Sequence, residues 1–379
     1  MYLYEYESRE ILTKYGIPVE EACIASNLEE AKECLERIPP PYVIKAQIRR
    51  GGRGKLGGIK IAHKKINALN EVSRMLGSTI GGFTVRKVLI SEKLNILRET
   101  YLSYTIDKGQ RSYVLLASPH GGIDVEEMHR KRPESLLKVY IDPLLGLKEY
   151  MVRKVVKHLG LDDSLASIVR ALYNVFIEYN CELVEVNPLA ITDRGVFAVD
   201  RRIIIDDSYA KLAPTPSISM LWERYVNELS EEERMAINNG FSYVELEGDI
   251  GVLGNGAGLT MATLDLVKLM GGKPGAFLDI GGGASSKRVK IAMSLLLKNK
   301  DLRCILVNVI GGITRCDEVA KGIVGAIRES GVRGKKIVVR LLGLNEEEGK
   351  MILAKAGINV FEDLSSSVKE VVSTNGACE

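Results

Sequence analysis

A glycine-rich segment at residues 51–58 carries residue types suited to binding a polyphosphate. It reads Gly-Gly-Arg-Gly-Lys-Leu-Gly-Gly, so that Arg53 and Lys55 stand among five glycines. Glycine lets backbone N–H groups approach an anion closely, and the two cations neutralise its charge. Lys45 lies on the preceding strand-like run and can reach the same phosphates. The alternative is a plain solvated basic hairpin, for which so many glycines are an unfavourable choice.

The same segment formally matches the Gly-x-Gly-x-x-Gly pattern of dinucleotide-binding proteins through Gly52, Gly54 and Gly57. That pattern must open a helix after its strand, whereas here the β-like run GIKIAH follows. A Walker A loop is excluded because Leu56 follows Lys55 where Ser or Thr is required. The segment is therefore predicted to form a flap at the tip of a β-hairpin.

A second predicted hairpin, residues 181–200, carries oxygen-bearing side chains at its open end. Alternation along a strand puts Glu185 and Asn187 on one face. A turn at 193–195 then allows strand pairing to bring Asn187 near Asp200. An amide oxygen and a carboxylate are ligands that Mg²⁺ accepts, with phosphates and water completing the shell. The residues alone are equally consistent with hydrogen-bonded polar side chains at hairpin ends.

Three further glycine clusters each follow a strand-like run, at residues 254–258, 281–283 and 311–312. Each leads into a helical pattern, and a helix N-terminus presents unpaired N–H groups and a positive dipole end to an anion. Three clusters on one sheet edge favour a phosphate-rich ligand or a phosphorylated partner residue over close packing alone. The first cluster also suggests an NAD site with Asp279 on the ribose, but Leu259 stands where the third glycine is needed.

Two different architectures are needed to position these residues. After residue 240, strand-like runs that are apolar on both faces alternate with helical patterns, which indicates a doubly wound parallel sheet. The runs cover 249–254, 275–280, 303–310, 335–342 and 357–361. Before residue 240, helices and antiparallel strands mix irregularly, which is typical of an α+β fold. We therefore expect an α/β fold combined with an α+β fold, as domains at residues 1–240 and 241–379.

The bulk composition narrows the class of protein. The chain has 379 residues, of which 46% are hydrophobic and 27% charged, and its net charge is +3. This balance predicts no nucleic-acid partner, and no apolar run reaches the roughly 18 residues of a membrane span. The first residues lack a signal-peptide pattern, so a cytoplasmic location is expected. The six cysteines form no CxxC pair and are expected to be buried and reduced, without a structural disulfide.

The longest motifs together resemble, in the same order and over nearly the whole chain, the β subunits of succinyl-CoA synthetases (succinate–CoA ligases). The segments are VIKAQIRRGGRGKLGG, LVEVNPLAIT, GNGAGLTMATLDLVK, FLDIGGGAS and NVIGGITRCDEVAKGI. The resemblance implies an N-terminal ATP-grasp fold followed by a flavodoxin-like CoA-ligase domain. It also implies reversible conversion of a nucleoside triphosphate, succinate and CoA to the diphosphate, phosphate and succinyl-CoA.

The resemblance further implies cofactors and partners. These are Mg²⁺, ATP/ADP or GTP/GDP, and an α subunit that carries CoA and a phosphorylatable histidine, in an αβ or α2β2 assembly. A malate–CoA ligase, or another acid–CoA ligase of the same superfamily, shares every motif. A binding module that senses NAD or a nucleotide is the alternative from another class.

The resemblance assigns roles to residues at matching positions. The implied nucleotide ligands are Lys45, Gly52, Arg53, Gly54, Glu92, Leu94 and Glu99. The implied metal ligands are Asn187 and Asp200. Glu185 matches the carboxylate that orients or deprotonates the histidine, and substrate and phosphohistidine contacts fall on Asn255, Gly312, Ile313 and Thr314. The chain departs from the family at Arg202, where a lysine is usual, so the charge is kept but the hydrogen-bond geometry changes.

The four histidines, His63, His120, His129 and His158, test whether the chain could carry the phosphoryl group itself. His158 is expected at a helix end, His63 at a strand end and His129 in a basic helical stretch. His120 precedes a Gly-Gly pair and is the one candidate carrier. We expect that none of the four is the carrier and that the chemistry is shared between subunits.

Overall fold

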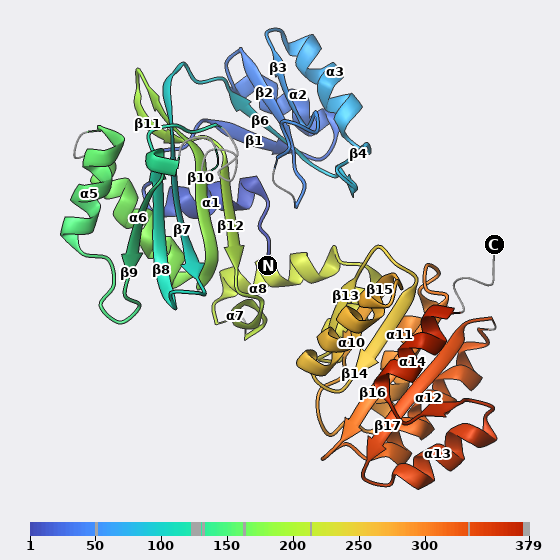
Figure 1. The fold of residues 1–379 in the computed structure, drawn as a ribbon. Coiled ribbons are helices and arrows are strands. Elements are labelled where there is room, and N and C mark those ends of the chain that lie inside the picture. The colour runs from blue at the N-terminus through green and yellow to red at the C-terminus, as the bar shows by residue number, and fades with distance from the viewer. Residues whose placement is uncertain are drawn as a thin grey trace. The chain divides into compact units, whose positions relative to one another are not determined.

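The chain folds as two compact units, residues 1–225 and 226–379, and each has its own hydrophobic cores. The computed structural model describes residues 1–49, 52–122, 130, 133–161, 164–212, 214–332 and 334–373. The border lies before α9 (Glu231–Asn238) rather than after it near residue 240, because Ala236 of this helix belongs to a core of the C-terminal unit. Figure 1 colours the N-terminal unit from blue to yellow-green and the C-terminal unit from yellow to red.

The N-terminal unit begins with a four-stranded antiparallel sheet in the order β1-β6-β2-β3. Its strands are β1 (Ala22–Ala25), β2 (Tyr42–Ala46), β3 (Ile59–Ala62) and β6 (Val88–Glu92). Helices α2 (Leu28–Arg37) and α3 (Lys65–Met75) pack on it through a shared core. Asn27 caps α2, since its side chain accepts the N–H groups of Glu29 and Glu30. A short hairpin, β4 (Thr79–Ile80) and β5 (Phe83–Thr84), follows α3.

A second sheet of the N-terminal unit has the order β11-β10-β7-β8-β9, and β12 pairs with the other part of β10. Its strands are β7 (Ile96–Asp107), β8 (Ser112–Ser118), β9 (Leu137–Ile141), β10 (Cys181–Thr192), β11 (Gly195–Ala198) and β12 (Arg201–Ile205). Helices α1 (Glu5–Lys14), α5 (Glu149–Leu159) and α6 (Ser164–Glu178) share its core (Figure 1). The helices α7 (Asp207–Leu212) and α8 (Pro216–Asn227) follow the last strand. The antiparallel pairing expected for β7 and β8 is confirmed.

The C-terminal unit is the doubly wound sheet that the sequence predicts. Its order is β13-β15-β14-β16-β17-β18, and every pairing is parallel except that of β13. The strands are β13 (Ser242–Glu245), β14 (Ile250–Gly254), β15 (Pro274–Asp279), β16 (Cys304–Gly311), β17 (Lys336–Gly343) and β18 (Val360–Phe361). The antiparallel edge strand β13 was not expected, because SYVE is short and mostly polar.

Alternate residues of the central strands serve the two faces of this sheet. Leu253 and Val307 belong to a core with α11 (Ser286–Lys298), α12 (Cys316–Ser330) and α13 (Glu346–Lys355). Val252 and Leu306 belong to the opposite core, with α10 (Ala257–Leu269) and α14 (Leu364–Ser373). Burial on both faces explains why these strands read as continuous apolar runs.

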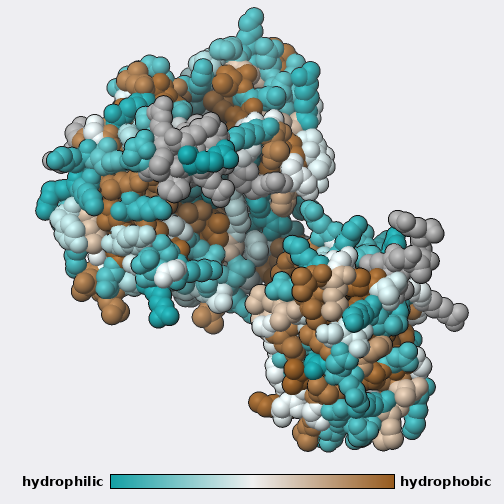
Figure 2. All heavy atoms as spheres, viewed as in Figure 1, coloured by the Kyte–Doolittle hydropathy of each residue, from teal (hydrophilic) through white to brown (hydrophobic). Residues whose placement is uncertain are grey.

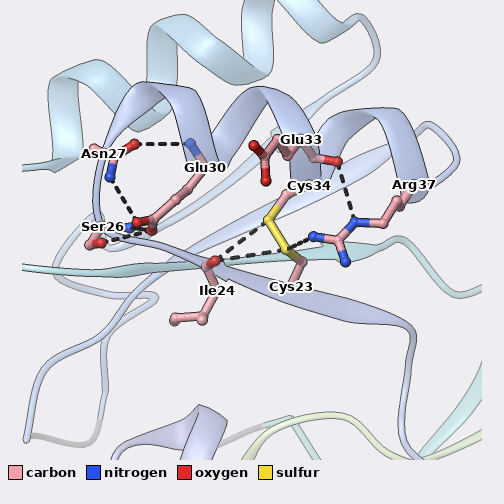
Figure 3. The surroundings of a disulfide bond; sticks show 8 residues. All are labelled: Cys23, Ile24, Ser26, Asn27, Glu30, Glu33, Cys34 and Arg37. Atoms are coloured by element: carbon pink, nitrogen blue, oxygen red, sulfur yellow. Dashed lines mark hydrogen bonds between the residues drawn. A yellow bond between two sulfur atoms is a disulfide. The ribbon is translucent and has the colours of Figure 1, made fainter.

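The expected absence of a disulfide is wrong. Cys23 of β1 and Cys34 of α2 are bonded to each other (Figure 3). The pairing arises because α2 packs against β1, a tertiary contact that the spacing of eleven residues does not reveal. Cys181, Cys304 and Cys316 are buried, as expected, and Cys378 lies outside the described residues.

Among the residues described, no helix combines the length and apolar character that crossing a bilayer requires. Figure 2 shows polar and apolar side chains intermingled on the visible face of each unit.

Candidate functional site

The glycine segment is the tip of a β-hairpin, as its sequence predicts. β2 and β3 pair antiparallel, with Lys45 opposite Ile59. The Gly58 N–H donates to the Arg53 carbonyl over 2.9 Å, and the Ala46 N–H donates to the Gly58 carbonyl over 2.8 Å, which closes the tip. Arg50 and Gly51 lie outside the described residues. The hairpin geometry excludes a dinucleotide-binding turn here, since no helix follows the glycines.

Two of the three candidate phosphate-binding cations, Lys45 and Arg53, are buried in ion pairs within the chain, whereas Lys55 is exposed. The Lys45 ammonium donates to Glu5 Oε1 over 2.7 Å, to Glu20 Oε1 over 3.4 Å and to the Val199 carbonyl over 2.8 Å. Arg53 contacts Glu5 Oε2 through Nη1 and Asp200 Oδ1 through Nη2, each over 2.7 Å. The side chains of Lys45 and Arg53 are only 5% and 7% exposed. Both cations lie at the end of the β2–β3 hairpin, and their role as phosphate ligands stays a prediction.

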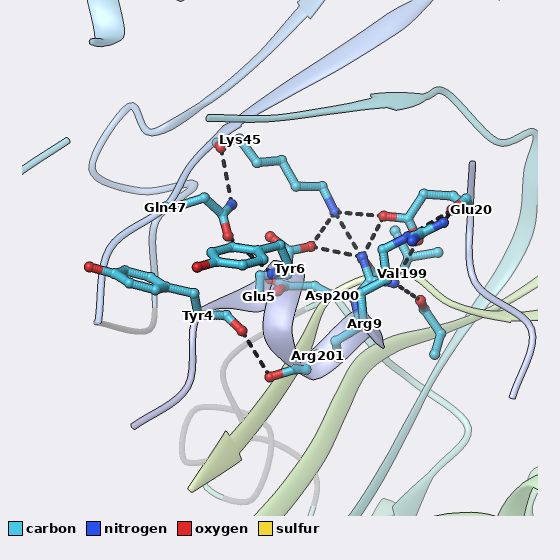
Figure 4. Close-up of polar contacts among 12 residues, drawn as sticks. Tyr4, Glu5, Tyr6, Arg9, Glu20, Lys45, Gln47, Val199, Asp200 and Arg201 are labelled. Carbon is cyan, nitrogen blue, oxygen red and sulfur yellow. Dashed lines mark hydrogen bonds and ion pairs between the residues drawn. The ribbon is translucent and has the colours of Figure 1, made fainter. Parts of the chain in front are cut away.

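A third cation completes this charge cluster. Arg201 Nη2 contacts Glu20 Oε1 over 2.5 Å and Glu5 Oε1 over 3.1 Å, and its side chain is fully buried. Figure 4 shows Lys45, Glu5, Glu20 and Arg201 converging from α1, β2, β12 and the segment before β1. Burial tends to raise the pKa of the Glu5 carboxyl, but Arg53, Lys45 and Arg201 hold this pKa well below its usual range. The pKa of Glu20 is lowered too, because Arg201 and Lys45 outweigh its burial.

Glu5 and Glu20 were missed by the sequence reasoning. Glu5 occupies the first turn of α1, where an acidic residue is ordinarily explained by the helix dipole. Glu20 lies in the extended segment between Pro18 and β1 and has no distinctive neighbours in the sequence. Their common feature is burial beside cations from remote segments, which only the fold reveals.

The second hairpin brings the two candidate metal ligands together. The Asn187 N–H donates to the Asp200 carbonyl over 2.8 Å. The chain returns along β11 as far as Ala198, bends at Val199 and Asp200, and pairs with β10 again as β12. Asn187 Oδ1 accepts the N–H of Gly122 over 2.7 Å. The side chains of these two residues, an amide and a carboxylate that is 39% exposed, offer the hard-oxygen donors that suit Mg²⁺.

Glu185 lies between neighbouring strands of the same sheet, opposite Arg202 of β12 and Ser103 of β7. Its Oε1 contacts Arg202 Nη2 over 2.8 Å, and its Oε2 accepts the Tyr101 hydroxyl over 3.3 Å. The side chain is 15% exposed. Burial raises the pKa of the Glu185 carboxyl, and Arg202 opposes this rise. A carboxylate held at both oxygens and still reachable from solvent is suited to orienting an imidazole.

Three of the implied nucleotide ligands, Glu92, Leu94 and Glu99, lie on the segment from the end of β6 into β7. Glu92 ends β6, where its Oε1 accepts the Glu21 N–H over 3.0 Å and contacts Arg194 over 2.8 Å. Leu94 is buried and Glu99 is exposed on β7. A turn at Gly121 and Gly122 packs against Glu99, because the Gly121 N–H donates to the Glu99 carbonyl and a Cβ on Gly122 would stand 2.1 Å from Glu99 Oε2.

In the C-terminal unit, the three glycine clusters meet at one sheet edge. β15, β14 and β16 are parallel neighbours and end at Asp279, Gly254 and Gly311. Asn255 Nδ2 donates to the Ile310 carbonyl over 2.9 Å, and Asn255 Oδ1 accepts the Ile310 N–H over 3.0 Å. The edge position predicted for the clusters is confirmed.

Thr314 ties these turns together. Its hydroxyl oxygen accepts the Gly283 N–H over 2.9 Å and Asn255 Nδ2 over 3.3 Å, and the residue is 1% exposed. Gly312 and Ile313 are instead exposed, Ile313 by 84%. The helix that follows this glycine cluster has Arg315 at its N-cap and Cys316 as the first residue of α12. Thr314 therefore shapes the edge, while Gly312 and Ile313 are open to a ligand or partner.

The described histidines differ in their surroundings. The His158 ring Nε2 lies 3.0 Å from the Ser135 carbonyl, in the last turn of α5 as expected. His63 is exposed at the end of β3. The backbone N–H of His120 donates to Ser118 Oγ over 3.1 Å. His129 lies outside the described residues.

Comparison with known proteins identifies the relatives of this chain. Residues 2–191 match the ATP-grasp domain and residues 253–372 match the CoA-ligase family. The chain is 46% identical over 376 residues to the β subunit of the ADP-forming succinate–CoA ligase of Ignicoccus hospitalis, covering 98% of both chains. It is 41% identical over 380 residues to the β subunit of the GDP-forming enzyme of Thermus thermophilus, covering 99% of both.

A solved ATP citrate lyase from Methanothrix soehngenii superposes with a TM-score of 0.71 at 18% identity, over 98% of this chain and 99% of that one. At this identity the superposition supports the fold alone. The full-length similarity to the curated relatives goes further, and by it the chain belongs to the family of succinate–CoA ligase β subunits.

Proposed function

We propose that this chain is the nucleotide- and succinate-binding β subunit of a nucleoside-diphosphate-forming succinate–CoA ligase. The observation that carries the proposal is identity of 46% over 98% of the chain to a β subunit of that enzyme. The chain would act in the cytoplasm with an α subunit that supplies CoA binding and a phosphorylatable histidine, in an αβ or α2β2 assembly. The reversible reaction joins succinate and CoA as a nucleoside triphosphate is split to the diphosphate and phosphate.

The N-terminal unit would hold the nucleotide. Lys45 and the tip residues Gly52, Arg53 and Gly54 would face its phosphates, because they place two cations and a glycine backbone at one hairpin end. The segment with Glu92, Leu94 and Glu99 would border the base and ribose. Asn187 and Asp200 would hold Mg²⁺, which neutralises phosphate charge when it is bound. Relatives of both ADP-forming and GDP-forming type leave either base compatible with this proposal.

Glu185 would act on the histidine of the α subunit. A carboxylate that accepts the N–H of one ring nitrogen fixes the tautomer and leaves the other nitrogen as the nucleophile. Arg202 and Tyr101 keep the Glu185 oxygens in place for this task. In the C-terminal unit, Asn255 and Gly312, Ile313 and Thr314 would contact succinate and the phosphohistidine. The exposed turn at Gly312 and Ile313 is accessible to such a ligand.

Labelled phosphate tests this division of labour. The chain is incubated with Mg²⁺ and ATP labelled at the γ-phosphate, alone and with its α subunit. We expect label that is acid-labile and base-stable on the α subunit only, and we expect succinate plus CoA to discharge it. Replacing succinate with malate in the discharge step identifies the acid. Label on this chain in the absence of the α subunit would contradict the proposal and direct attention to His120.

A further inference from the structure

Arg53 contacts two carboxylates at once, those of Glu5 and Asp200. It bridges Glu5 Oε2 and Asp200 Oδ1, both at 2.7 Å, and its side chain is 7% exposed. In the proposed function, Asp200 binds Mg²⁺ and Arg53 binds the nucleotide phosphates. While Arg53 and Asp200 are paired with each other, Arg53 is not directed at phosphate and Asp200 is not available to the metal ion. A divalent cation and a guanidinium on one carboxylate also repel each other.

The remaining charges show that the cluster tolerates loss of this pair. The cations Lys45, Arg53 and Arg201 balance the carboxylates Glu5, Glu20 and Asp200 in the structure. If Arg53 and Asp200 both turn to the ligand, Lys45 and Arg201 still balance Glu5 and Glu20, through contacts of 2.5 to 3.4 Å. Glu5 then keeps two cationic partners and is not left as an unpaired buried charge.

We propose that Arg53 is an internal counter-cation, which occupies the metal carboxylate Asp200 in the nucleotide-free protein and exchanges it for phosphate oxygens when the metal–nucleotide complex binds. Glu5 is a positioning residue that retains the guanidinium beside Asp200 until the exchange. The inference rests on the proposed function. It adds that Arg53 lowers the affinity of the chain for the metal ion when no nucleotide is bound. Metal and nucleotide therefore favour each other's binding by more than their direct contact provides.

Metal affinity without nucleotide tests the exchange. Mn²⁺ serves as the probe, and unbound Mn²⁺ is measured by electron paramagnetic resonance. Arg53→Gln removes the competitor, so Mn²⁺ affinity is expected to rise by about fivefold, the magnitude of a partly exposed ion pair. The same substitution is expected to weaken ADP binding measured with a chelator, because a phosphate ligand is lost. Stronger Mn²⁺ binding together with weaker ADP binding distinguishes the exchange from a general loss of structure, which would weaken both.

Three further variants complete the test. Lys60→Gln removes an exposed cation of the same hairpin and is expected to leave Mn²⁺ affinity unchanged. Arg53→Gln combined with Asp200→Asn is expected to abolish the gain, which locates it at Asp200. Arg53→Lys keeps the charge but cannot bridge two carboxylates, and is expected to give a smaller gain. If Arg53→Gln does not show a native circular dichroism spectrum, the Mn²⁺ affinity of Arg53→Lys is used instead.

Unchanged or weaker Mn²⁺ binding in a folded Arg53 variant would overturn the exchange. If ADP binding still weakened in that variant, the proposed function would stand. If the unaltered chain bound neither ADP nor its Mg²⁺ complex, the proposed function would fall with the inference.

Discussion

The charge state of Glu185 is subject to two opposing influences, the neighbouring cation Arg202 and the burial of the carboxylate. Arg202 contacts one carboxylate oxygen over 2.8 Å and favours the charged form, whereas burial disfavours it and raises the pKa. Compared with the lysine that the family resemblance implies at this position, the planar guanidinium of Arg202 fixes the direction of the carboxylate more firmly than an ammonium would. The substitution therefore preserves the charge needed at this position and restricts the rotamers of Glu185.

The carboxylate of Glu185 is expected to be necessary for phosphoryl transfer but not for nucleotide binding. Glu185→Gln should lower the rate of α-subunit phosphorylation by roughly 100-fold or more, the range of a lost general base. ADP affinity, measured by calorimetry, should be unchanged. Glu182→Gln, an exposed glutamate on the same strand, is the matched control and should retain the rate. Loss of ADP binding in Glu185→Gln would instead indicate a structural role.

The raised pKa of Glu185 predicts the acid side of the pH profile. The reactive form is the carboxylate, and an elevated pKa means that protons remove it at a higher pH than for an ordinary glutamate. The phosphorylation rate should therefore begin to fall, as the pH decreases, before an ordinary glutamate would titrate. Single-turnover rates across the acid range measure this limb. Glu185→Gln should abolish the limb, and a limb that persists unchanged in the variant would assign it to another group.

At the scale of elements, the carboxyl edge of the C-terminal sheet depends on the Thr314 hydroxyl. Thr314→Val keeps the side-chain shape but leaves the Gly283 N–H without its acceptor, which should destabilise the unit by about 1–3 kcal/mol. Discharge of the phosphorylated α subunit by succinate and CoA should slow, while ADP affinity stays constant. Thr314→Ser retains the hydroxyl and should restore most of the rate. Equal rates for the valine and serine variants would show that the hydroxyl contributes nothing.

The Cys23–Cys34 disulfide joins β1 to α2, and β1 pairs with β6, which ends at Glu92. Closing a loop with a separation of eleven residues is expected to contribute about 3 kcal/mol through the unfolded chain. Replacing both cysteines with serine should lower the melting temperature of the N-terminal unit. Reductant should lower that of the unaltered protein to the same value and leave the variant unaffected. A reductant-dependent shift in the variant would place the sensitive thiols elsewhere.

Local patterns predicted most elements, and tertiary contacts account for the rest. The glycine flap and the βα units were recognisable because the residues that determine their backbone conformation are adjacent in the sequence. Gly57, which has a positive φ, is an example. The turns around Asn255 could be placed at one sheet edge because parallel strands share a direction. Glu5 and the partner of Cys34 could not be identified, since each acquires its role from a segment distant in the sequence.

At the scale of the whole molecule, the two units have separate cores and contribute different halves of the proposed chemistry. The cores of residues 1–225 draw on the first two sheets and on helices that include α1, α2, α3, α5 and α6, and those of residues 226–379 draw on the doubly wound sheet and helices α9 to α14. The candidate nucleotide ligands all belong to the first set and Asn255 and Thr314 to the second. A ligand bound by the residues of one unit is therefore expected to stabilise the core of that unit.

This separation predicts the calorimetric behaviour of the intact chain. Heating should give two unfolding transitions, because neither core needs the other to exclude water. Magnesium and ADP together, at about 100 times the dissociation constant, should stabilise the N-terminal unit by about 2.7 kcal/mol and raise only its transition. Asp200→Asn should reduce that shift, whereas Thr314→Val should lower only the other transition and so identify it. A single transition that ADP raises as a whole would show that the two units unfold as one cooperative body.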